Sequence, residues 1–167
     1  MATGSVPHAA AGAETIDRVL TVVEKVILLR GVDVFSEVPT SDLSLLAAVA
    51  EEVTVSAGEP IYSEKDASDS MYVVVEGSVR LHRDGREVVV AGANEAFGTW
   101  ALFDDEPRVT SASAGADGRL LRIDKEAFVD LLADNVQITQ GVLKAVVRRL
   151  RRILARVDGE SPRGETS

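Results

Sequence analysis

Apolar positions recur with a helical spacing near both ends of the chain. Residues 14–30 carry apolar side chains three and four positions apart, and this spacing predicts a first helix. A second helix is predicted after Ser41, whose hydroxyl can cap its first turn. Val34 and Phe35 lie between the two helices, and we expect both side chains to pack inward.

The middle of the chain, from Val53 to about residue 123, has the short apolar period of β-strands. Its apolar runs are rich in β-branched residues and are broken at short intervals by Gly, Asp or Ser. Asp84 and Gly85 stand between two such runs and form a strong hairpin signal. Many short strands joined by turns predict a sandwich, a jelly roll or a barrel.

The helical period returns in the last third of the chain. Residues 125–133 form one amphipathic segment with Asp124 as its cap, and a longer helix is predicted over residues 139–157. The predicted fold class is therefore α+β, with a β-roll or jelly roll flanked by N-terminal and C-terminal helices. The longer helix carries an apolar seam of about two heptads, formed by Leu143, Val146, Leu150, Ile153 and Val157. This seam and the apolar stripe of the first helix predict a homodimer through the terminal helices. Because two heptads alone are too short to be stable, the dimer should also use the N-terminal helix or the roll.

Composition and charge narrow the classes of function. The 167 residues fit one domain at 31–157 behind the first helix, between tails at 1–13 and 158–167 that we expect to be disordered. A net charge of −9 argues against nucleic-acid binding, and no helix-turn-helix pattern follows the longer helix. No apolar run is long enough to span a membrane and no signal peptide is visible, so we expect a cytoplasmic protein.

Catalytic and metal chemistry have little support in the sequence. The chain has no cysteine, and its two histidines, His8 and His82, are far apart along the chain. No nucleophile elbow or serine–histidine–acid set is present. We therefore expect no enzyme activity, no metal site and no cofactor.

The segment FGTWALFDDEPRVTSASA, residues 97–114, interrupts the strand pattern. Its glycine, Gly98, precedes an apolar stretch that predicts one or two helical turns with open N–H groups. Arg108 follows ten residues later on what we expect to be a returning strand, and an arginine facing a helix N-terminus can clamp a phosphate. The alternative is that Arg108 pairs with the acidic residues 104–106 and has only a structural role.

This segment resembles the phosphate-binding cassette of the cyclic nucleotide-binding domain family, which includes catabolite activator protein. The family pattern is Phe-Gly-Glu-Leu-Ala-Leu, a variable turn, then Pro-Arg-Ala-Ala-Thr. This chain matches the cassette at Phe97, Gly98, Ala101, Leu102, Pro107 and Arg108. It matches the barrel pattern of the family at Gly58, Asp66, Tyr72, Val74, Gly77 and Val79. The resemblance covers residues 31–157 and implies the β-roll fold and a cyclic nucleotide, cAMP or cGMP, as the ligand.

The resemblance also implies roles for individual residues. Arg108 would pair with the cyclic phosphate, and backbone N–H groups at Gly98 and the following turn would bind phosphate and sugar. The family's glutamate, which accepts a hydrogen bond from the ribose 2′-hydroxyl, is replaced here by Thr99, so the cassette is degenerate. Lys65 stands where the family has a glycine. The predicted ligand-binding residues are Phe97, Gly98, Thr99, Trp100, Ala101, Pro107, Arg108, Val109, Thr110 and Ser111.

These departures leave alternatives for single residues and for the whole chain. Thr99 could be a plain helix cap, and for Trp100 we favour core filling over stacking on a base. The first functional hypothesis is a sensor of cAMP or a related nucleotide with weakened ribose recognition. The second is a ligand-free relative that serves as a dimerisation or protein-interaction module. Transcriptional control would need a DNA-binding segment that the sequence does not contain.

Overall fold

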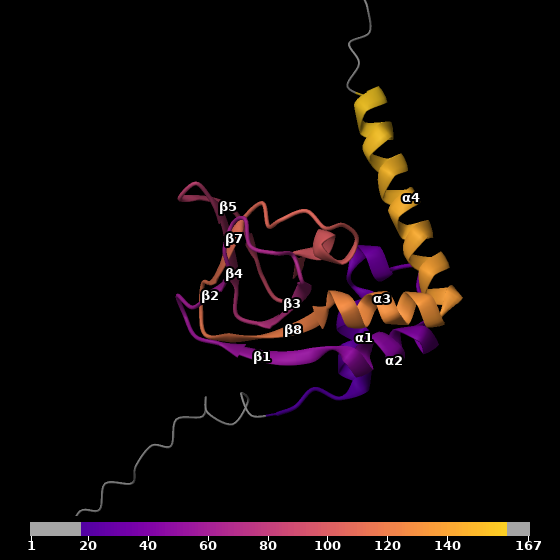
Figure 1. Cartoon of the computed structure of the whole chain (residues 1–167), viewed down its shortest axis with the longest axis horizontal. Coiled ribbons are helices and arrows are strands. Elements are labelled where there is room, and N and C mark those ends of the chain that lie inside the picture. Colours follow the sequence, from indigo (N-terminus) through magenta and orange to yellow (C-terminus); the bar gives the residue numbers. More distant parts are fainter. Residues whose placement is uncertain (1–17, 160–167) are drawn as a thin grey trace, which may run out of the picture.

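The molecule consists of a β-roll with a group of helices at one end (Figure 1). The computed structural model describes residues 18–159. Before the roll come α1 (Val22–Arg30), the 3-10 helix η1 (Asp33–Phe35) and α2 (Thr40–Val49). After it come α3 (Lys125–Asp134) and α4 (Val136–Gly159), and α4 projects away from the rest of the fold. The predicted α+β architecture, a β-roll between N-terminal and C-terminal helices, is confirmed.

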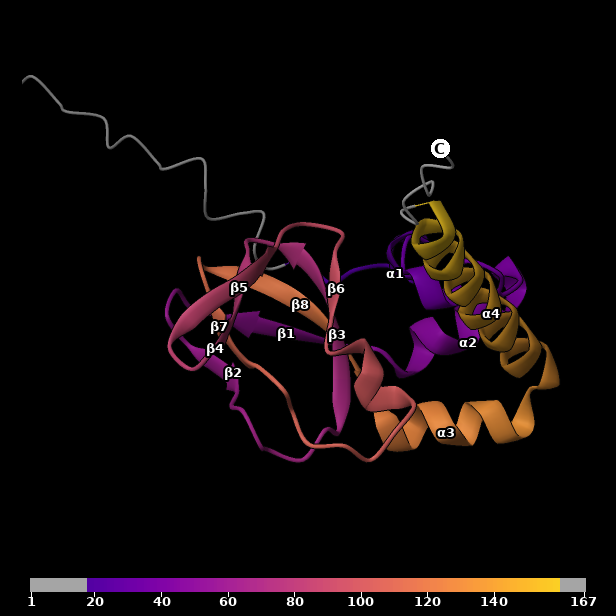
Figure 2. The same ribbon diagram turned by 90° about the horizontal axis from the view of Figure 1, so that it is seen from above.

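The roll contains two antiparallel four-stranded sheets, with the orders β1-β8-β3-β6 and β2-β7-β4-β5. A short 3-10 helix, η2 (Thr99–Leu102), follows β6 and lies on the side of the roll that faces the helices (Figure 2). The strands are β1 (Glu51–Val55), β2 (Pro60–Tyr62), β3 (Ser70–Glu76), β4 (Val79–Arg83), β5 (Arg86–Ala91), β6 (Ala96–Phe97), β7 (Ser111–Ala114) and β8 (Gly118–Asp124).

Strand β3 joins the two apolar cores of the fold. Because successive side chains of a strand point to opposite faces, Met71 and Val73 pack into the core beneath the helices, whereas Tyr72 and Val74 face the inside of the roll. Phe35 is fully buried in the helical core, as predicted. The helices and the roll therefore share one wall, and η2 lies beside it.

The first helix is shorter than predicted. Residues 18–21 are not helical, and α1 begins at Val22. Thr21 accepts a hydrogen bond from the backbone N–H of Glu24, and the Glu24 carboxylate accepts one from the backbone N–H of Thr21. This capping box fixes the start of the helix, and its signature, Thr-x-x-Glu, is visible in the sequence. Residues 14–17 of the predicted helix lie outside the described residues.

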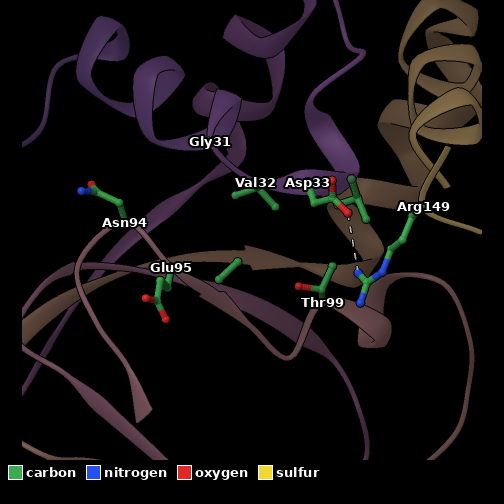
Figure 3. A pocket seen from close by; sticks show the side chains of 9 residues that line it. Gly31, Val32, Asp33, Asn94, Glu95, Thr99 and Arg149 are labelled. Atoms are coloured by element: carbon green, nitrogen blue, oxygen red, sulfur yellow. Dashed lines mark ion pairs between the residues drawn. The ribbon is translucent and has the colours of Figure 1, made fainter. Parts of the chain in front are cut away.

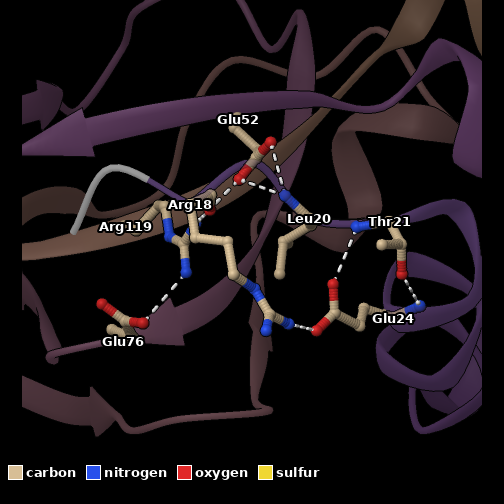
Figure 4. A network of polar contacts seen from close by, with 7 residues as sticks. All are labelled: Arg18, Leu20, Thr21, Glu24, Glu52, Glu76 and Arg119. Carbon is tan, nitrogen blue, oxygen red and sulfur yellow. Dashed lines mark hydrogen bonds and ion pairs between the residues drawn. The ribbon is translucent and has the colours of Figure 1, made fainter. Parts of the chain in front are cut away.

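A buried arginine holds the segment before α1 against the roll (Figure 4). Arg119 of β8 is 7% exposed and pairs with Glu52 at 3.0 Å and with Glu76 at 2.9 Å. It also donates to the backbone oxygen of Arg18, while both carboxylate oxygens of Glu52 accept from the N–H of Leu20. These polar contacts occupy the backbone of residues 18–20, which is a second reason why the helix does not extend there.

The other element boundaries mostly agree with the prediction. The hairpin at Asp84 and Gly85 is confirmed, and both residues have the positive φ of a tight β-turn. Asp124 caps α3 by accepting from the N–H of Ala127. Helix α2 starts at Thr40 after Pro39 rather than after a Ser41 cap. Helix α4 runs over Val136–Gly159, so residues 158 and 159 belong to it and not to a tail.

The apolar seam of α4 lies largely on the surface. Leu143, Leu150, Ile153 and Val157 are each about half exposed or more, and only Val146 is partly buried against the helical core. Within residues 18–159 no helix combines the length and the apolar character needed to cross a bilayer. The predicted tail 1–13 lies outside the described residues, as does the remainder of the C-terminal tail from residue 160.

Candidate functional site

A cavity of about 570 Å³ opens between η2 and the loop that leads back into β7. This volume is in the ordinary range of small-ligand sites. Nine of the ten predicted site residues line it, namely Phe97, Gly98, Thr99, Trp100, Ala101, Pro107, Arg108, Val109 and Thr110. Ser111 does not line it, and its hydroxyl accepts a hydrogen bond from the backbone N–H of Glu64, 2.9 Å away. The cassette thus forms one wall of a pocket.

The backbone at Gly98 turns the chain from β6 into η2. Gly98 has φ of 68° and ψ of 18°, a left-handed conformation that a residue with a Cβ adopts at a cost of about 1–2 kcal/mol. A Cβ at this position would also meet Nη1 of Arg108 at 2.7 Å. Gly98 is the N-terminal cap of η2, so Thr99 is the first residue of the turn and not its cap, contrary to that alternative.

The guanidinium of Arg108 lies in the wall of the cavity and is almost fully buried, with 6% of the residue exposed. Its Nη2 donates to the backbone oxygen of Ser70 at 2.5 Å, and its Nη1 lies 3.5 Å from the oxygen of Gly98. Asp69 contributes a carboxylate 3.7 Å from Nη2. The Nε is buried and has no hydrogen-bond partner within the part of the chain that the structure describes. A buried charge with an unused donor is the kind of group that an anion satisfies.

The backbone of Arg108 is held by the turn at residues 63–66. The backbone N–H of Arg108 donates to the backbone oxygen of Asp66 at 2.9 Å, and the backbone oxygen of Arg108 accepts from the N–H of Lys65 at 2.8 Å. These two bonds fix the loop that carries Arg108, although the loop is not part of a strand. The expectation of a returning strand at Arg108 is wrong, since β7 begins only at Ser111. Lys65 has φ of 70°, which explains why a glycine suits this position better.

An aromatic cluster supports the arginine from the side of the roll. The guanidinium carbon of Arg108 lies 4.0 Å from the ring centroid of Tyr62, a cation–π distance. Tyr62 packs in turn against Tyr72 and Phe97, whose rings are stacked 5.1 Å apart. Burial raises the pKa of the Tyr62 hydroxyl above its ordinary value, although the positive charge of Arg108 opposes this shift. Tyr62 was not among the predicted site residues.

Within residues 18–159 no ion pair joins Arg108 to the acidic residues after η2, so the pairing assumed in that alternative is wrong. Lys125 instead pairs with one of them, since its Nζ lies 2.6 Å from the carboxylate of Asp105 and 2.5 Å from the backbone oxygen of Asp104. This hydrogen bond and the charge of Lys125 lower the pKa of the Asp105 carboxyl. Arg108 is turned inward to Ser70, away from the acidic turn.

Trp100 is at the mouth of the cavity and does not fill the core, contrary to our prediction. Its side chain is 53% exposed, and the guanidinium carbon of Arg149 from α4 lies 4.9 Å from its ring centroid. Phe103 is partly exposed and packs edge-on against Phe128 of α3. The cassette therefore touches both C-terminal helices.

A second, smaller cavity of about 330 Å³ lies between η1, the turn before β6 and α4 (Figure 3). Arg149 reaches into it and lies 3.9 Å from the carboxylate of Asp33, and Thr99 stands beside the guanidinium. Ala96, Thr99 and Arg149 line both cavities. Sequence reasoning missed Arg149 and Asp33, because nothing in the local pattern indicates that a helix fifty residues away returns to the cassette.

The site offers several kinds of group that can bind a ligand. It provides a buried cation, the open N–H groups at the start of η2, aromatic faces and a partly exposed second arginine. No cluster of three or more metal-ligating side chains occurs within residues 18–159. The arrangement can hold a small anionic ligand with an apolar portion.

Comparison with known proteins shows to which family the chain belongs. The model of the cyclic nucleotide-binding domain matches residues 52–135. A CRP-like cAMP-activated global transcriptional regulator of Mycobacterium tuberculosis is 29% identical over 130 residues, which are 75% of this chain and 58% of that protein. The N-terminal domain of a transcriptional regulator from Streptomyces coelicolor A3(2) is 34% identical, with a TM-score of 0.70, over 75% of this chain and 94% of that domain.

The catabolite activator protein of Thermus thermophilus is also similar, with 27% identity and a TM-score of 0.61 over 75% of this chain and 62% of that chain. The chain thus spans little more than half the length of the curated relative from Mycobacterium tuberculosis. The matched region contains the whole cassette, the Asp66 turn and the strands that carry them. The chain belongs to the cyclic nucleotide-binding domain family.

Proposed function

We propose that the chain is a non-catalytic regulatory domain that senses cAMP or a related cyclic nucleotide in the cavity beside η2. The observation that carries this proposal is the buried guanidinium of Arg108, which lies in the cavity wall with its Nε unpaired among residues 18–159. A cyclic phosphate is a compact monoanion that suits such a donor. The similarity to a regulator described as cAMP-activated supports the choice of ligand.

The contacts of Arg108 suggest how a phosphate enters. Asp69 is 68% exposed and lies at 3.7 Å from Nη2, beyond hydrogen-bond distance, so it is a weak partner that a phosphate can replace. Asp69 then retains its contact with Arg122 at 3.8 Å. The hydrogen bond from Arg108 to Ser70 is buried and remains, which keeps the guanidinium oriented. The open N–H groups of Thr99 and Trp100 at the start of η2 add donors to the same ligand.

Thr99 weakens the recognition of the ribose in this proposal. A hydrogen bond to a charged group contributes about 1.5–3 kcal/mol, so the loss of the family's carboxylate lowers affinity by roughly 10- to 150-fold. A threonine hydroxyl is too short to reach as far as a glutamate. The proposed sensor therefore binds a cyclic mononucleotide less tightly than a relative with the intact cassette.

The second hypothesis, a ligand-free interaction module, has its own supporting observation. Both terminal nitrogens of Arg108 already face backbone oxygens, so the side chain is partly satisfied without a ligand. The two hypotheses differ in what the cavity does and not in the fold. A binding measurement separates them.

The test is calorimetric titration of the full chain with cAMP and then cGMP, together with Arg108→Ala and Thr99→Glu. We expect weak binding by the wild type, none by Arg108→Ala, and binding by Thr99→Glu that is tighter by about tenfold or more. Arg80→Ala removes an exposed arginine of β4 and is the matched control, with unchanged affinity. No heat from the wild type or from Thr99→Glu at millimolar nucleotide would leave the interaction module as the function.

We also propose that the chain forms a homodimer through its terminal helices. Leu143, Leu150 and Val157 expose apolar surface along α4, and Val23 and Ile27 do so on α1. A continuous apolar stripe on a projecting helix is stabilised by a second such helix. Leu150→Glu is expected to give a monomer in sedimentation equilibrium, while Arg151→Glu on the same turn is the charge-changing control. A wild type that remains monomeric at millimolar concentration would contradict the dimer.

A further inference from the structure

The pocket of Arg108 and the smaller cavity beside α4 are neighbours that meet at Thr99. The cavities of about 570 Å³ and about 330 Å³ share Ala96, Thr99 and Arg149 in their walls. Thr99 is a short side chain in the shared wall, and in the smaller cavity it lies beside Arg149 (Figure 3). The site is therefore larger than the space around Arg108 alone.

The side chains at this wall offer hydrogen-bond donors where the family has a glutamate. A carboxylate can only accept hydrogen bonds, and it suits a ribose hydroxyl as a donor. Here the wall carries the hydroxyl of Thr99, which can donate or accept, and the guanidinium of Arg149, which can only donate. A group of the ligand that lies at Thr99 and Arg149 is thus expected to be an acceptor, and an anion most of all.

The charge of Arg149 is available to such a group. Its contact with Asp33 is 3.9 Å, longer than a hydrogen bond, and 41% of its side chain is exposed. Asp33 has a closer partner, because Arg152 donates to its other carboxylate oxygen at 2.9 Å. Asp33 can therefore stay paired when Arg149 turns to a ligand. Stacking on Trp100 keeps the guanidinium at the mouth of the larger cavity.

The acidic residues near the shared wall do not remove its preference for an anionic group. Glu95 lines the smaller cavity, but its carboxylate points away from Arg149 and lies 3.4 Å from the backbone N–H of Gly92. Asp104 and Glu106 line the larger cavity, and both are exposed to solvent, where their charges are screened. Asp33 is shared between two arginines. Arg149 is the one cation of the shared wall within residues 18–159.

We propose that this site takes a nucleotide with two separate phosphate groups, one bound by Arg108 and the second by Arg149 across Thr99. The inference rests on the proposed function, because it uses Arg108 as the first phosphate site. The ligand class is a dinucleotide, either cyclic, with two phosphodiesters, or linear, with one phosphodiester and a terminal phosphate. Arg149 is then a specificity-determining residue that α4 contributes to the pocket.

The experiment compares three probes on the full chain: cAMP, cyclic di-AMP and the linear dinucleotide pApA. Calorimetry gives the affinities, and the fluorescence of Trp100, which is the only tryptophan of the chain, reports on the stack with Arg149. At least one dinucleotide is expected to bind about tenfold or more tightly than cAMP, as a charge-assisted hydrogen bond implies. Comparison of cyclic di-AMP with pApA shows whether the cyclic or the linear dinucleotide binds more tightly.

Three variants identify the residue responsible. Arg149→Gln should weaken binding of the dinucleotide about tenfold more than binding of cAMP, and so remove the advantage of the dinucleotide. Arg156→Gln makes the same charge change on α4 away from both cavities and should alter neither affinity. Thr99→Glu should act in opposite directions, with tighter binding of cAMP and weaker binding of the dinucleotide, because it restores an acceptor where the second phosphate would lie.

The outcomes separate this inference from the proposed function. If cAMP binds through Arg108 and neither dinucleotide binds more tightly, the two-phosphate site is wrong and the cyclic mononucleotide sensor stands. If a dinucleotide binds through Arg108 and Arg149 while cAMP gives no signal, the site stands and the mononucleotide proposal fails. If Arg149→Gln weakens all three probes equally, Arg149 does not read a second phosphate. No binding by any probe would overturn both.

Discussion

Replacement of Gly98 by alanine tests the geometry on which the site depends. The new Cβ would lie 2.7 Å from Nη1 of Arg108 and 3.4 Å from the backbone oxygen of Ser70. The backbone oxygen cannot easily move, so the guanidinium of Arg108 has to shift. We therefore expect Gly98→Ala to damage both the stability of the fold and the binding of an anion.

Gly85→Ala is a matched control for the backbone part of this effect. Gly85 has φ of 75°, close to the 68° of Gly98, but a Cβ there would meet nothing within 4 Å. The left-handed conformation costs an alanine about 1–2 kcal/mol, partly offset by a gain of about 0.4–1 kcal/mol from the stiffer unfolded chain. Gly85→Ala should thus lower the free energy of unfolding by about 1 kcal/mol.

Gly98→Ala should cost more than this control, because it also disturbs a buried hydrogen bond of a charged group. Such a bond contributes about 1.5–3 kcal/mol, and the difference between the two variants should be of that order. In thermal unfolding of a chain of this size, the difference corresponds to roughly 3–12 °C in Tm. Ligand titration should show lower affinity for Gly98→Ala only. Equal stability and equal affinity in the two variants would refute the placement of Arg108 against Gly98.

Three further predictions concern residues around the site and the roll. Lys65 has a positive φ of 70°, so Lys65→Gly should raise the free energy of unfolding by about 0.5–1 kcal/mol in urea, and a loss of stability would be the wrong sign. Burial raises the pKa of Tyr62, so the stabilisation from its neutral form is complete below about pH 10 and is lost as the pH rises through the raised pKa. Above pH 10 the Tm of the wild type should therefore fall more steeply with pH than the Tm of Tyr62→Phe. Parallel falls in the two Tm values would count against burial of the hydroxyl. Glu52→Ala leaves the buried charge of Arg119 with one carboxylate fewer and should cost about 3 kcal/mol in urea unfolding, while a cost under about 0.5 kcal/mol would mark an ordinary surface pair.

The order of elements could be predicted from local patterns in the sequence, and the location of the pocket from the resemblance of residues 97–114 to a family cassette. Two-residue periodicity and the Asp84–Gly85 turn gave the strands and the hairpin of the roll. Gly98 and Arg108 mark the cassette because the first needs a left-handed backbone and the second carries the charge. Nine of the ten residues predicted for the site line one cavity.

Two of the errors came from contacts between segments distant in the sequence, and one came from a local helix cap. Trp100 was expected in the core, yet Arg149 of α4 holds it at the surface, and no local pattern indicates that contact. Tyr62 was overlooked because its place beneath Arg108 depends on how β2 pairs with β7. The first helix was drawn too long because its apolar spacing continues upstream of Thr21, whereas the capping box with Glu24 starts it. In each case a tertiary contact or a cap outweighed periodicity.

The most direct test of the central claim is a crystal structure of the full chain grown with a saturating concentration of cAMP. We expect the nucleotide in the cavity beside η2, with a phosphate oxygen within hydrogen-bond distance of the Arg108 guanidinium and of the N–H groups at the start of η2. Arg108 should keep its bond to Ser70, and Asp69 should have moved away from it. A nucleotide bound elsewhere, or an empty cavity with Arg108 still paired as it is now, would contradict the account.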